Sequence, residues 1–93
     1  MARIVVLDDE KDACELIERV LSPVHEVVSF TEEDEAIAYV KANPVDLAIL
    51  DIKLKKLSGV DVLEILRQAR PEVKAVMLTG YPTLETARES VKL

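Results

Sequence analysis

Residues 45–51 limit the possible folds more than any other part of the chain. They read VDLAILD, a largely apolar run with β-branched residues that is too short for a helix and ends on a carboxylate. Such a run is typical of a strand buried on both faces at the centre of a parallel sheet. Asp51 would then lie at the carboxyl end of this strand, where open α/β sheets bind their ligands. The segment therefore predicts a parallel sheet with a site at one edge.

Two further apolar runs end on polar side chains in the same way. Residues 4–7 are followed by two adjacent aspartates, Asp8 and Asp9, and residues 75–78 are followed by Thr79. Because the carboxyl ends of parallel strands meet at one edge of the sheet, three acids and a hydroxyl are expected to gather there. This gathering predicts a functional site at that edge.

Strands and helices are expected to alternate along the chain. The predicted strands cover residues 4–7, 26–30, 45–51 and 73–78, and a helix follows each of them. The second strand is shorter and more polar, so it is expected at a sheet edge. Four β-α units in succession require parallel strands, right-handed crossovers and helices on both faces of the sheet. The predicted fold class is therefore α/β, in one domain over residues 1–93.

Apolar residues at helical spacing predict which side of each helix faces the sheet. The expected inner residues are Ala13, Leu16, Ile17, Val20 and Leu21 in the first helix, Glu33, Ala36, Ile37 and Val40 in the second, and Val62, Ile65, Leu66 and Ala69 in the third. Thr31 is expected to cap the second helix and Thr83 the fourth. Gly59 precedes the third helix, where a positive φ angle is expected. Cys14 lies beside the first stripe and is interpreted as a packing residue.

Composition excludes several classes of function. The net charge of −6 argues against a nucleic-acid surface, and one Phe and two Tyr with no Trp offer little for stacking bases. A single cysteine permits no internal disulfide. No apolar run approaches the roughly 20 residues that span a bilayer, and the N-terminus enters a strand without room for a signal peptide. A cytoplasmic protein is expected.

The acids at the predicted sheet edge need a compensating positive charge. Three carboxylates within several ångströms of one another repel by roughly 3 kcal/mol per pair at an effective dielectric constant near 20. For Asp8, Asp9 and Asp51 the expected compensation is Mg²⁺, which binds one or two carboxylates and completes its coordination with water and phosphate oxygens. An aspartate held beside Mg²⁺ can act as a nucleophile toward a phosphoryl group, and Thr79 would supply a hydroxyl donor.

The chain carries three motifs in a specific order and with matching spacings. They are Leu7-Asp8-Asp9-Glu10 after the first strand, Asp51 at the end of the third strand with Gly59 eight positions on, and Thr79-Gly80 after the fourth. In these motifs, and over its whole length, the chain resembles the receiver domain of two-component response regulators. The resemblance implies a flavodoxin-like, doubly wound parallel sheet with strand order 2-1-3-4-5.

The resemblance also implies a role for each of these residues. Asp51 would be phosphorylated by a partner sensor histidine kinase. Asp9 with help from Asp8, together with Asp51 and the backbone carbonyl of Lys53, would bind Mg²⁺. Thr79 would be the switch hydroxyl that moves toward the phosphoryl group. Such a domain is a signalling module rather than an enzyme, and it acts on an output domain or a downstream protein.

Two departures from the family's pattern affect these expectations. Lys55 occupies a position where the family often has proline, and this is expected to loosen the loop. The family has five β-α units, with a lysine at the end of the fifth strand that pairs with the phosphoryl group, whereas this chain stops before that strand. The expected strand order is therefore 2-1-3-4 with the fifth strand missing. Residues 73–78 would then form an exposed edge, through which the chain would pair with a second copy, exchange segments with it or be unstable alone.

Three classes of function remain open. The first is a phosphoacceptor signalling domain, which the acidic triad and Thr79 favour. The second is an interaction module that keeps the fold without phosphorylation, which the missing lysine favours. The third is a small phosphohydrolase with an aspartyl nucleophile; that class resembles the haloacid dehalogenases, which place two acids one residue apart, whereas Asp8 and Asp9 are adjacent. The first class is the preferred interpretation.

Overall fold

The computed structural model describes residues 1–52, 54 and 56–78. The predictions for Lys53, Lys55, Thr79 and the helix capped by Thr83 therefore lie outside the described residues. Strands and helices alternate in the described part, as the sequence predicted. The elements are β1 (Arg3–Leu7), α1 (Lys11–Leu21), β2 (Glu26–Phe30), α2 (Glu33–Ala42), β3 (Leu47–Asp51), α3 (Gly59–Ala69) and β4 (Lys74–Leu78).

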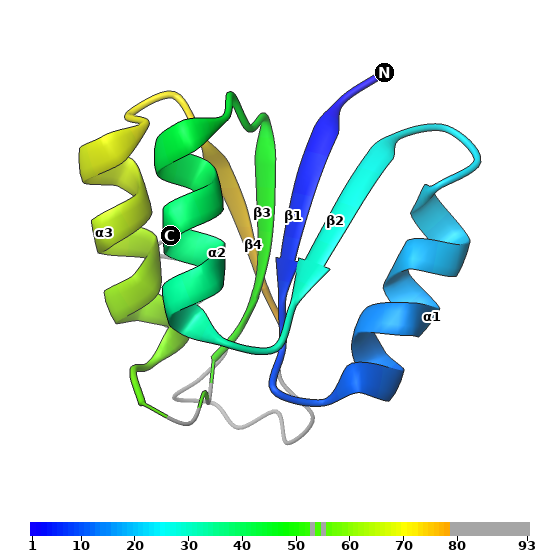
Figure 1. Cartoon of the computed structure of the whole chain (residues 1–93), viewed down its shortest axis with the longest axis horizontal. Helices are drawn as coiled ribbons and strands as arrows, with labels where there is room; N and C mark the ends of the chain where they lie inside the picture. Colours follow the sequence, from blue (N-terminus) through cyan, green and yellow to red (C-terminus); the bar gives the residue numbers. More distant parts are fainter. Residues whose placement is uncertain (53, 55, 79–93) are drawn as a thin grey trace.

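The four described strands form one parallel sheet in the order β2-β1-β3-β4. Helices α2 and α3 cover one face of the sheet and α1 covers the other (Figure 1). This arrangement confirms the predicted α/β class, the doubly wound topology and the predicted order of these four strands. Leu7 at the end of β1 lies opposite Leu50 of β3, so both strands bring their carboxyl ends to the same edge.

Two hydrophobic clusters pack against the sheet, one on each face. The larger cluster lies beneath α2 and α3 and includes fully buried side chains from both central strands, such as Val5, Leu7 and Leu50. The smaller one lies beneath α1 and contains Ile4, Val6, Cys14 and Ile49. Alternate residues of β1 thus face opposite clusters, and both central strands are buried on both faces, as predicted for a parallel sheet.

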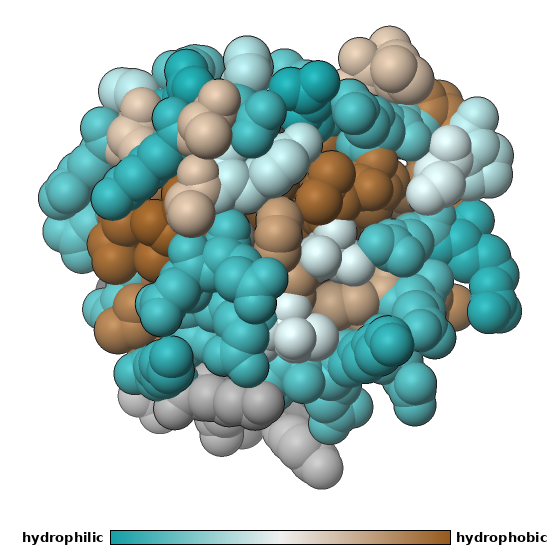
Figure 2. All heavy atoms as spheres, in the orientation of Figure 1, coloured by the Kyte–Doolittle hydropathy of each residue, from teal (hydrophilic) through white to brown (hydrophobic). Residues whose placement is uncertain are grey.

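Strand β2 lies at one end of the sheet and is less buried than β1 and β3. None of its residues is fully buried. Figure 2 shows hydrophobic side chains in the middle of this view, over β1 and β2, surrounded by hydrophilic ones. The prediction of an edge position for this strand is confirmed.

Strand β4 lies at the other end of the described sheet, which confirms the predicted edge position of this strand among the described ones. Its residues alternate, and Val76 and Leu78 remain 46 % and 39 % exposed. Among the described strands β4 pairs only with β3. Val76 pairs with Ile49 of β3, which belongs to the cluster under α1, so the exposed residues of β4 lie on the α1 side of the sheet. The pairing of this edge with a second copy stays a prediction.

The buried face of α1 differs from the predicted stripe. Leu16 and Val20 are 58 % and 65 % exposed, whereas Cys14 is buried, with Ile17 and Leu21 packed against its cluster. At 100° per residue these three side chains share one side of the helix, and Leu16 and Val20 fall on its outer flank. The predicted stripe was therefore too broad, and the interpretation of Cys14 as a packing residue is confirmed.

Helix α2 presents the predicted side to the sheet, since Glu33, Ala36 and Val40 are fully buried. The predicted cap is wrong: the N-cap residue is Glu32 rather than Thr31, and it makes no side-chain capping hydrogen bond. Instead, the first residue of the helix places a carboxylate inside the protein.

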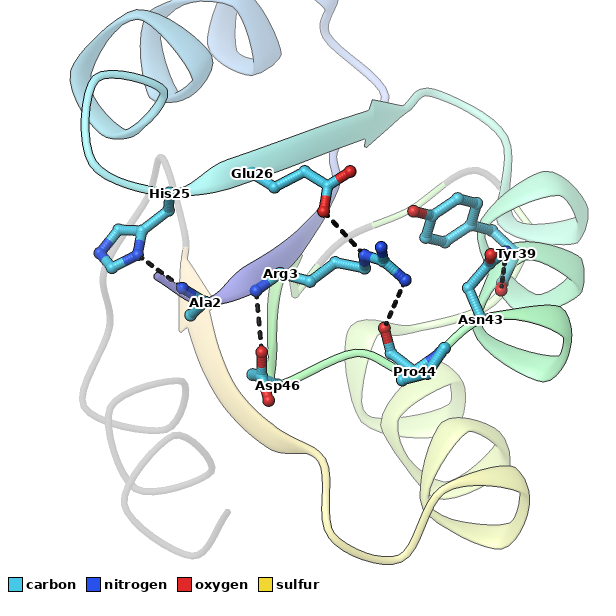
Figure 3. A network of polar contacts seen from close by, with 8 residues as sticks. All are labelled: Ala2, Arg3, His25, Glu26, Tyr39, Asn43, Pro44 and Asp46. Carbon is cyan, nitrogen blue, oxygen red and sulfur yellow. Dashed lines mark hydrogen bonds and ion pairs between the residues drawn. The ribbon is translucent and has the colours of Figure 1, made fainter.

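A polar network joins the amino ends of three strands, at the end of the sheet opposite Asp51 (Figure 3). The backbone N–H of Arg3 donates to Asp46 Oδ2 at 2.8 Å, and the Arg3 guanidinium pairs with Glu26 at 2.9 Å. The backbone N–H of Ala2 donates to His25 Nδ1 at 3.0 Å. The network ties the start of β1 to the starts of β2 and β3, and this aligns their carboxyl ends.

No helix in residues 1–52, 54 and 56–78 has the length and apolar content to cross a membrane.

Candidate functional site

Three carboxylates meet at the carboxyl edge of the sheet. Asp8 and Asp9 follow β1, and Asp51 ends the neighbouring strand β3. All three residues are half-buried, and one carboxylate oxygen from each lies within 4.8 Å of the other two. The predicted convergence of these acids is therefore present. The other two predicted site residues, Lys53 and Thr79, lie outside the described residues.

The backbone around Asp8 is held from several sides. Its N–H donates to the carbonyl oxygen of Phe30 at 3.2 Å, which extends the contact between β1 and β2 by one residue. The thiol of Cys14 donates to the Asp8 carbonyl oxygen at 3.5 Å. Asp8 Oδ1 accepts from the N–H of Glu10 at 2.9 Å, just before α1 begins. Asp8 thus stabilises the turn just before α1 and still lies close to the other two acids.

The site concentrates negative charge in a partly desolvated place. Burial raises the pKa of Asp8, the hydrogen bond from Glu10 lowers it, and the neighbouring charge of Asp9 raises it again, so the net pKa lies above the ordinary value. A raised pKa means that the ionised form is under-stabilised. The site therefore favours a bound cation.

Replacing Asp8 with asparagine is expected to stabilise the metal-free protein at pH 7. Because the pKa of Asp8 is higher in the folded than in the unfolded protein, ionisation of Asp8 lowers the stability of the fold. Protonated Asp8 carries no such cost, so stability with respect to this group is highest below about pH 3.8 and falls as the pH rises through the folded-state pKa. The D8N variant should therefore have a melting temperature higher than wild type at pH 7 and equal to it at pH 3. Thermal melts in chelator measure this.

The control for this prediction is Asp12→Asn, which removes the same charge from the exposed first turn of α1. Loss of an acid there weakens the interaction with the helix dipole, so this variant should not be stabilised. An equal increase in both variants would assign the effect to net charge and contradict a local cause at Asp8.

The segment after Asp51 is fixed by backbone hydrogen bonds at both ends. Ile52 donates its N–H to the carbonyl oxygen of Leu78 at 2.9 Å, and Gly59 donates its N–H to the carbonyl oxygen of Ile52 at 2.8 Å. Ser58 then begins α3 with a capping box that it shares with Asp61. The start of α3 thus lies next to Ile52, directly after the end of β3.

Gly59 has a different role from the one predicted. Its φ angle is not positive, so the expectation of a left-handed conformation is wrong. A Cβ atom there would lie 2.5 Å from Met77 Cε and closer still to the backbone oxygen of Asp51. Glycine is therefore required by close packing: α3 begins directly against the backbone of the residue that carries the candidate site.

Sequence reasoning placed Glu33 on the inner side of α2 but gave it no role. Its Oε2 accepts from the backbone N–H groups of Lys56 and Leu57, which belong to the loop after Asp51. The available signal was a glutamate within an otherwise apolar helical stripe, since a buried charge needs specific partners.

The three acids fit a hard divalent cation such as Mg²⁺. Such ions prefer oxygen ligands, and at metal–oxygen distances of about 2.1 Å two oxygens on one ion are at most about 4.2 Å apart. Because all three oxygens lie within 4.8 Å of one another, one such ion can be bound by two of them directly, with Asp8 as the expected ligand through water. The raised pKa of Asp8 supplies the electrostatic reason for a cation at this place.

Comparison with known proteins places these features in a family. Residues 4–93 match the family model described as the response regulator receiver domain. The chain is 32 % identical over 93 residues to the photosynthetic apparatus regulatory protein RegA of Cereibacter sphaeroides, covering 97 % of this chain and 50 % of RegA. It thus spans about half the length of that curated relative and as little as 17 % of others.

Solved structures show the same fold. A CheY-like receiver domain protein from Methanospirillum hungatei matches with a TM-score of 0.87 and 30 % identity, over 99 % of this chain and 74 % of that one. A response regulator from Burkholderia pseudomallei, solved with a phosphorylated aspartic acid, a calcium ion and citrate, matches with a TM-score of 0.86 and 26 % identity, over 99 % and 55 %. With its flavodoxin-like sheet and its cluster of acids at the carboxyl edge, this chain belongs to the response regulator receiver domain family.

Proposed function

We propose that this chain is a phosphoacceptor domain, in which Asp51 takes a phosphoryl group from a partner histidine kinase. The observation that carries the proposal is the convergence of Asp51 with Asp8 and Asp9 at the carboxyl edge of the sheet. Mg²⁺ would be held by these three carboxylates and by the backbone carbonyl of Lys53. Thr79 would act as the switch hydroxyl. The phosphorylated aspartic acid and calcium ion of the Burkholderia regulator support the same pairing of acyl phosphate and divalent cation.

The geometry suits a nucleophilic carboxylate. Asp51 is the last residue of a strand buried on both faces, and one of its carboxylate oxygens lies within 4.8 Å of those of Asp8 and Asp9. One carboxylate oxygen of Asp51 attacks the phosphorus atom carried by the histidine of the kinase. The bond between phosphorus and the histidine nitrogen breaks, and an acyl phosphate forms on Asp51. Asp8 and Asp9 face the reacting oxygen and hold the cation site open beside it. A divalent cation bound there would neutralise charge on the transferred group.

The product of this reaction is the signal itself. The phosphoryl group on Asp51 carries about 1.5 to 2 negative charges at the end of β3, in place of the single charge of the carboxylate. These charges would appear next to the start of α3 and the end of β4, because the Asp51 backbone contacts both. An output domain or downstream protein that reads these elements is the partner that the proposal implies.

Treatment with phosphoramidate or acetyl phosphate and Mg²⁺ is expected to add one phosphoryl group to the wild-type chain. Asp51→Asn should prevent this completely, because the amide removes the nucleophilic oxygen. Intact-mass spectrometry measures the product. The matched control is Asp46→Asn, at the opposite end of the same strand, which keeps an oxygen to accept from the N–H of Arg3 and should be phosphorylated like wild type.

Two results would contradict the proposal. Phosphorylation of the Asp51→Asn variant at wild-type level would move the acceptor elsewhere. No phosphorylation of folded wild-type protein would favour the second class of function, an interaction module that has the fold without the chemistry.

A further inference from the structure

Glu33 is the one fully buried charged side chain in the described part of the molecule. It is the first residue of α2, far in sequence from the acids of the candidate site. A buried carboxylate is costly unless its oxygens are hydrogen-bonded, so its surroundings show what retains it.

The partners of Glu33 are two consecutive backbone amides of the loop that follows Asp51. Oε2 accepts from the N–H of Lys56 at 2.7 Å and from the N–H of Leu57 at 3.1 Å. These contacts span 23 and 24 residues of sequence, so they join α2 to a distant loop. The loop is thereby held at a middle point as well as at its two ends.

The charge on Glu33 strengthens this attachment. Burial by itself raises the pKa of Glu33, but hydrogen bonds from its own backbone N–H and from the amides of Lys56 and Leu57 lower it, and so does the charge of Lys56. The net pKa lies below the ordinary value, so the side chain is a carboxylate that receives charge-assisted hydrogen bonds.

The second oxygen of Glu33 argues against a purely stabilising role. Oε1 is buried and has no hydrogen-bond partner among the described residues. Native proteins satisfy almost all such atoms, and a buried acceptor without a donor costs stability. An apolar residue at this position would fill the same space without that cost. The arrangement therefore favours placement of the loop over maximum stability.

We propose that Glu33 is a positioning residue for the Asp51 site. Its carboxylate fixes residues 56–57 and, through them, the loop that begins next to Asp51 and carries the Lys53 carbonyl assigned above to Mg²⁺. The inference rests on the proposed function, because it takes the purpose of the loop from that assignment. In this role the first residue of α2 helps to position the site, although Glu33 does not belong to the cluster of Asp8, Asp9 and Asp51.

Two variants of Glu33 test the inference in the full 93-residue chain. Glu33→Ala removes both acceptor oxygens, and Glu33→Gln keeps one side-chain oxygen in a nearly identical shape. The local readout is hydrogen exchange of the Lys56 and Leu57 amides, followed by NMR. Loss of hydrogen bonds to a charged group should speed exchange of both amides by roughly 10- to 100-fold in Glu33→Ala. Glu33→Gln should fall between Glu33→Ala and wild type.

The functional readout is the affinity for Mg²⁺ alone, measured by calorimetry. Removing a residue that orients metal ligands without contacting the metal typically lowers the affinity for the metal by about 10- to 100-fold. Glu33→Ala is therefore expected to weaken Mg²⁺ binding by roughly 10-fold.

Two controls separate positioning from general loss of stability. Val73→Ala creates a cavity in the core just before β4, away from the loop, and should lower the melting temperature without changing Mg²⁺ affinity. Asp34→Ala removes the exposed 3.5 Å ion pair with the Lys56 side chain and keeps the Glu33 contacts. It should leave both readouts near wild type, since exposed ion pairs contribute little.

The outcomes distinguish this inference from the proposed function. If Asp51→Ala abolishes Mg²⁺ binding while Glu33→Ala binds like Val73→Ala, the role of Glu33 is overturned and the function stands. If wild type binds no Mg²⁺, the proposed function and the role of Glu33 are both overturned. If Glu33→Ala does not fold, Glu33→Gln decides by the same two readouts: unchanged exchange and affinity would overturn the inference, and a partial loss of both would support it.

Discussion

Replacing Gly59 with alanine is expected to lower the melting temperature of this domain by roughly 10–20 °C, or to unfold it. The new Cβ would lie 2.5 Å from Met77 Cε and still closer to the backbone oxygen of Asp51. Real Cβ atoms do not approach other atoms so closely, so α3 or the end of β3 has to move. Overpacking a buried site costs about 1–3 kcal/mol and more where the backbone cannot yield, which is a large part of the stability of a small domain. Thermal and urea melts measure the loss.

A double variant shows which contact causes this loss. Met77 is flexible and can withdraw its terminal methyl group, whereas the Asp51 carbonyl belongs to a strand paired on both sides. Adding Met77→Ala to Gly59→Ala should therefore restore little stability. Near-complete recovery in the double variant would show that Met77, and not the backbone of Asp51, requires glycine at this position.

Mg²⁺ is expected to stabilise the wild-type domain, and Asp51→Ala is expected to abolish this effect. At a concentration one hundred times its Kd, a ligand adds about 2.7 kcal/mol to the free energy of unfolding, which corresponds to a melting-temperature increase of roughly 10–20 °C. Asp51 lies on the strand next to the one that ends at Asp8 and Asp9, so its removal leaves an incomplete ligand set. Asp9→Ala should reduce the stabilisation strongly. Asp8→Ala should reduce it less, because Asp8 is assigned a contact through water.

The control for the metal prediction is Asp12→Ala at constant ionic strength. Asp12 lies close in sequence to the first two acids but points into solvent from the first turn of α1. Removing it changes the net charge equally and leaves the cluster intact, so Mg²⁺ should stabilise this variant as much as wild type. Equal stabilisation of the Asp51→Ala variant would exclude these carboxylates as the site of binding.

The proposed phosphoacceptor and Glu33 are connected through the same short segment of chain. Ile52 follows the proposed phosphoacceptor directly. The backbone N–H of Lys56 donates to Glu33 of α2, and Gly59 then begins α3 against the Asp51 backbone. Asp51 is therefore connected to α3 directly, through Gly59, and to α2 through residues 56–57 and Glu33. Measurements of amide exchange at Lys56 with and without phosphorylation would show whether this contact responds to the modification.

The order of elements and the meeting of the acids were determined by the sequence alone. The apolar runs of β1 and β3 and the aspartates at their carboxyl ends are local features, and parallel strands necessarily bring their carboxyl ends together. The convergence of Asp8, Asp9 and Asp51 needed no knowledge of side-chain packing. The same local reasoning correctly placed β2 at an edge of the sheet.

Only the tertiary structure decided how the helices and the loop support the site. The sequence pattern included Leu16 in the buried side of α1, but the side of the helix that packs on the sheet is centred on Cys14, Ile17 and Leu21 and leaves Leu16 exposed. The sequence predicted a positive φ angle at Gly59, but its φ angle is not positive. Glycine is needed there because the Asp51 carbonyl packs against it. The contact between Glu33 and the amides of Lys56 and Leu57 joins residues more than twenty positions apart. Periodicity reports which side of an element is apolar, and it carries no information on which distant backbone group will lie against a given side chain.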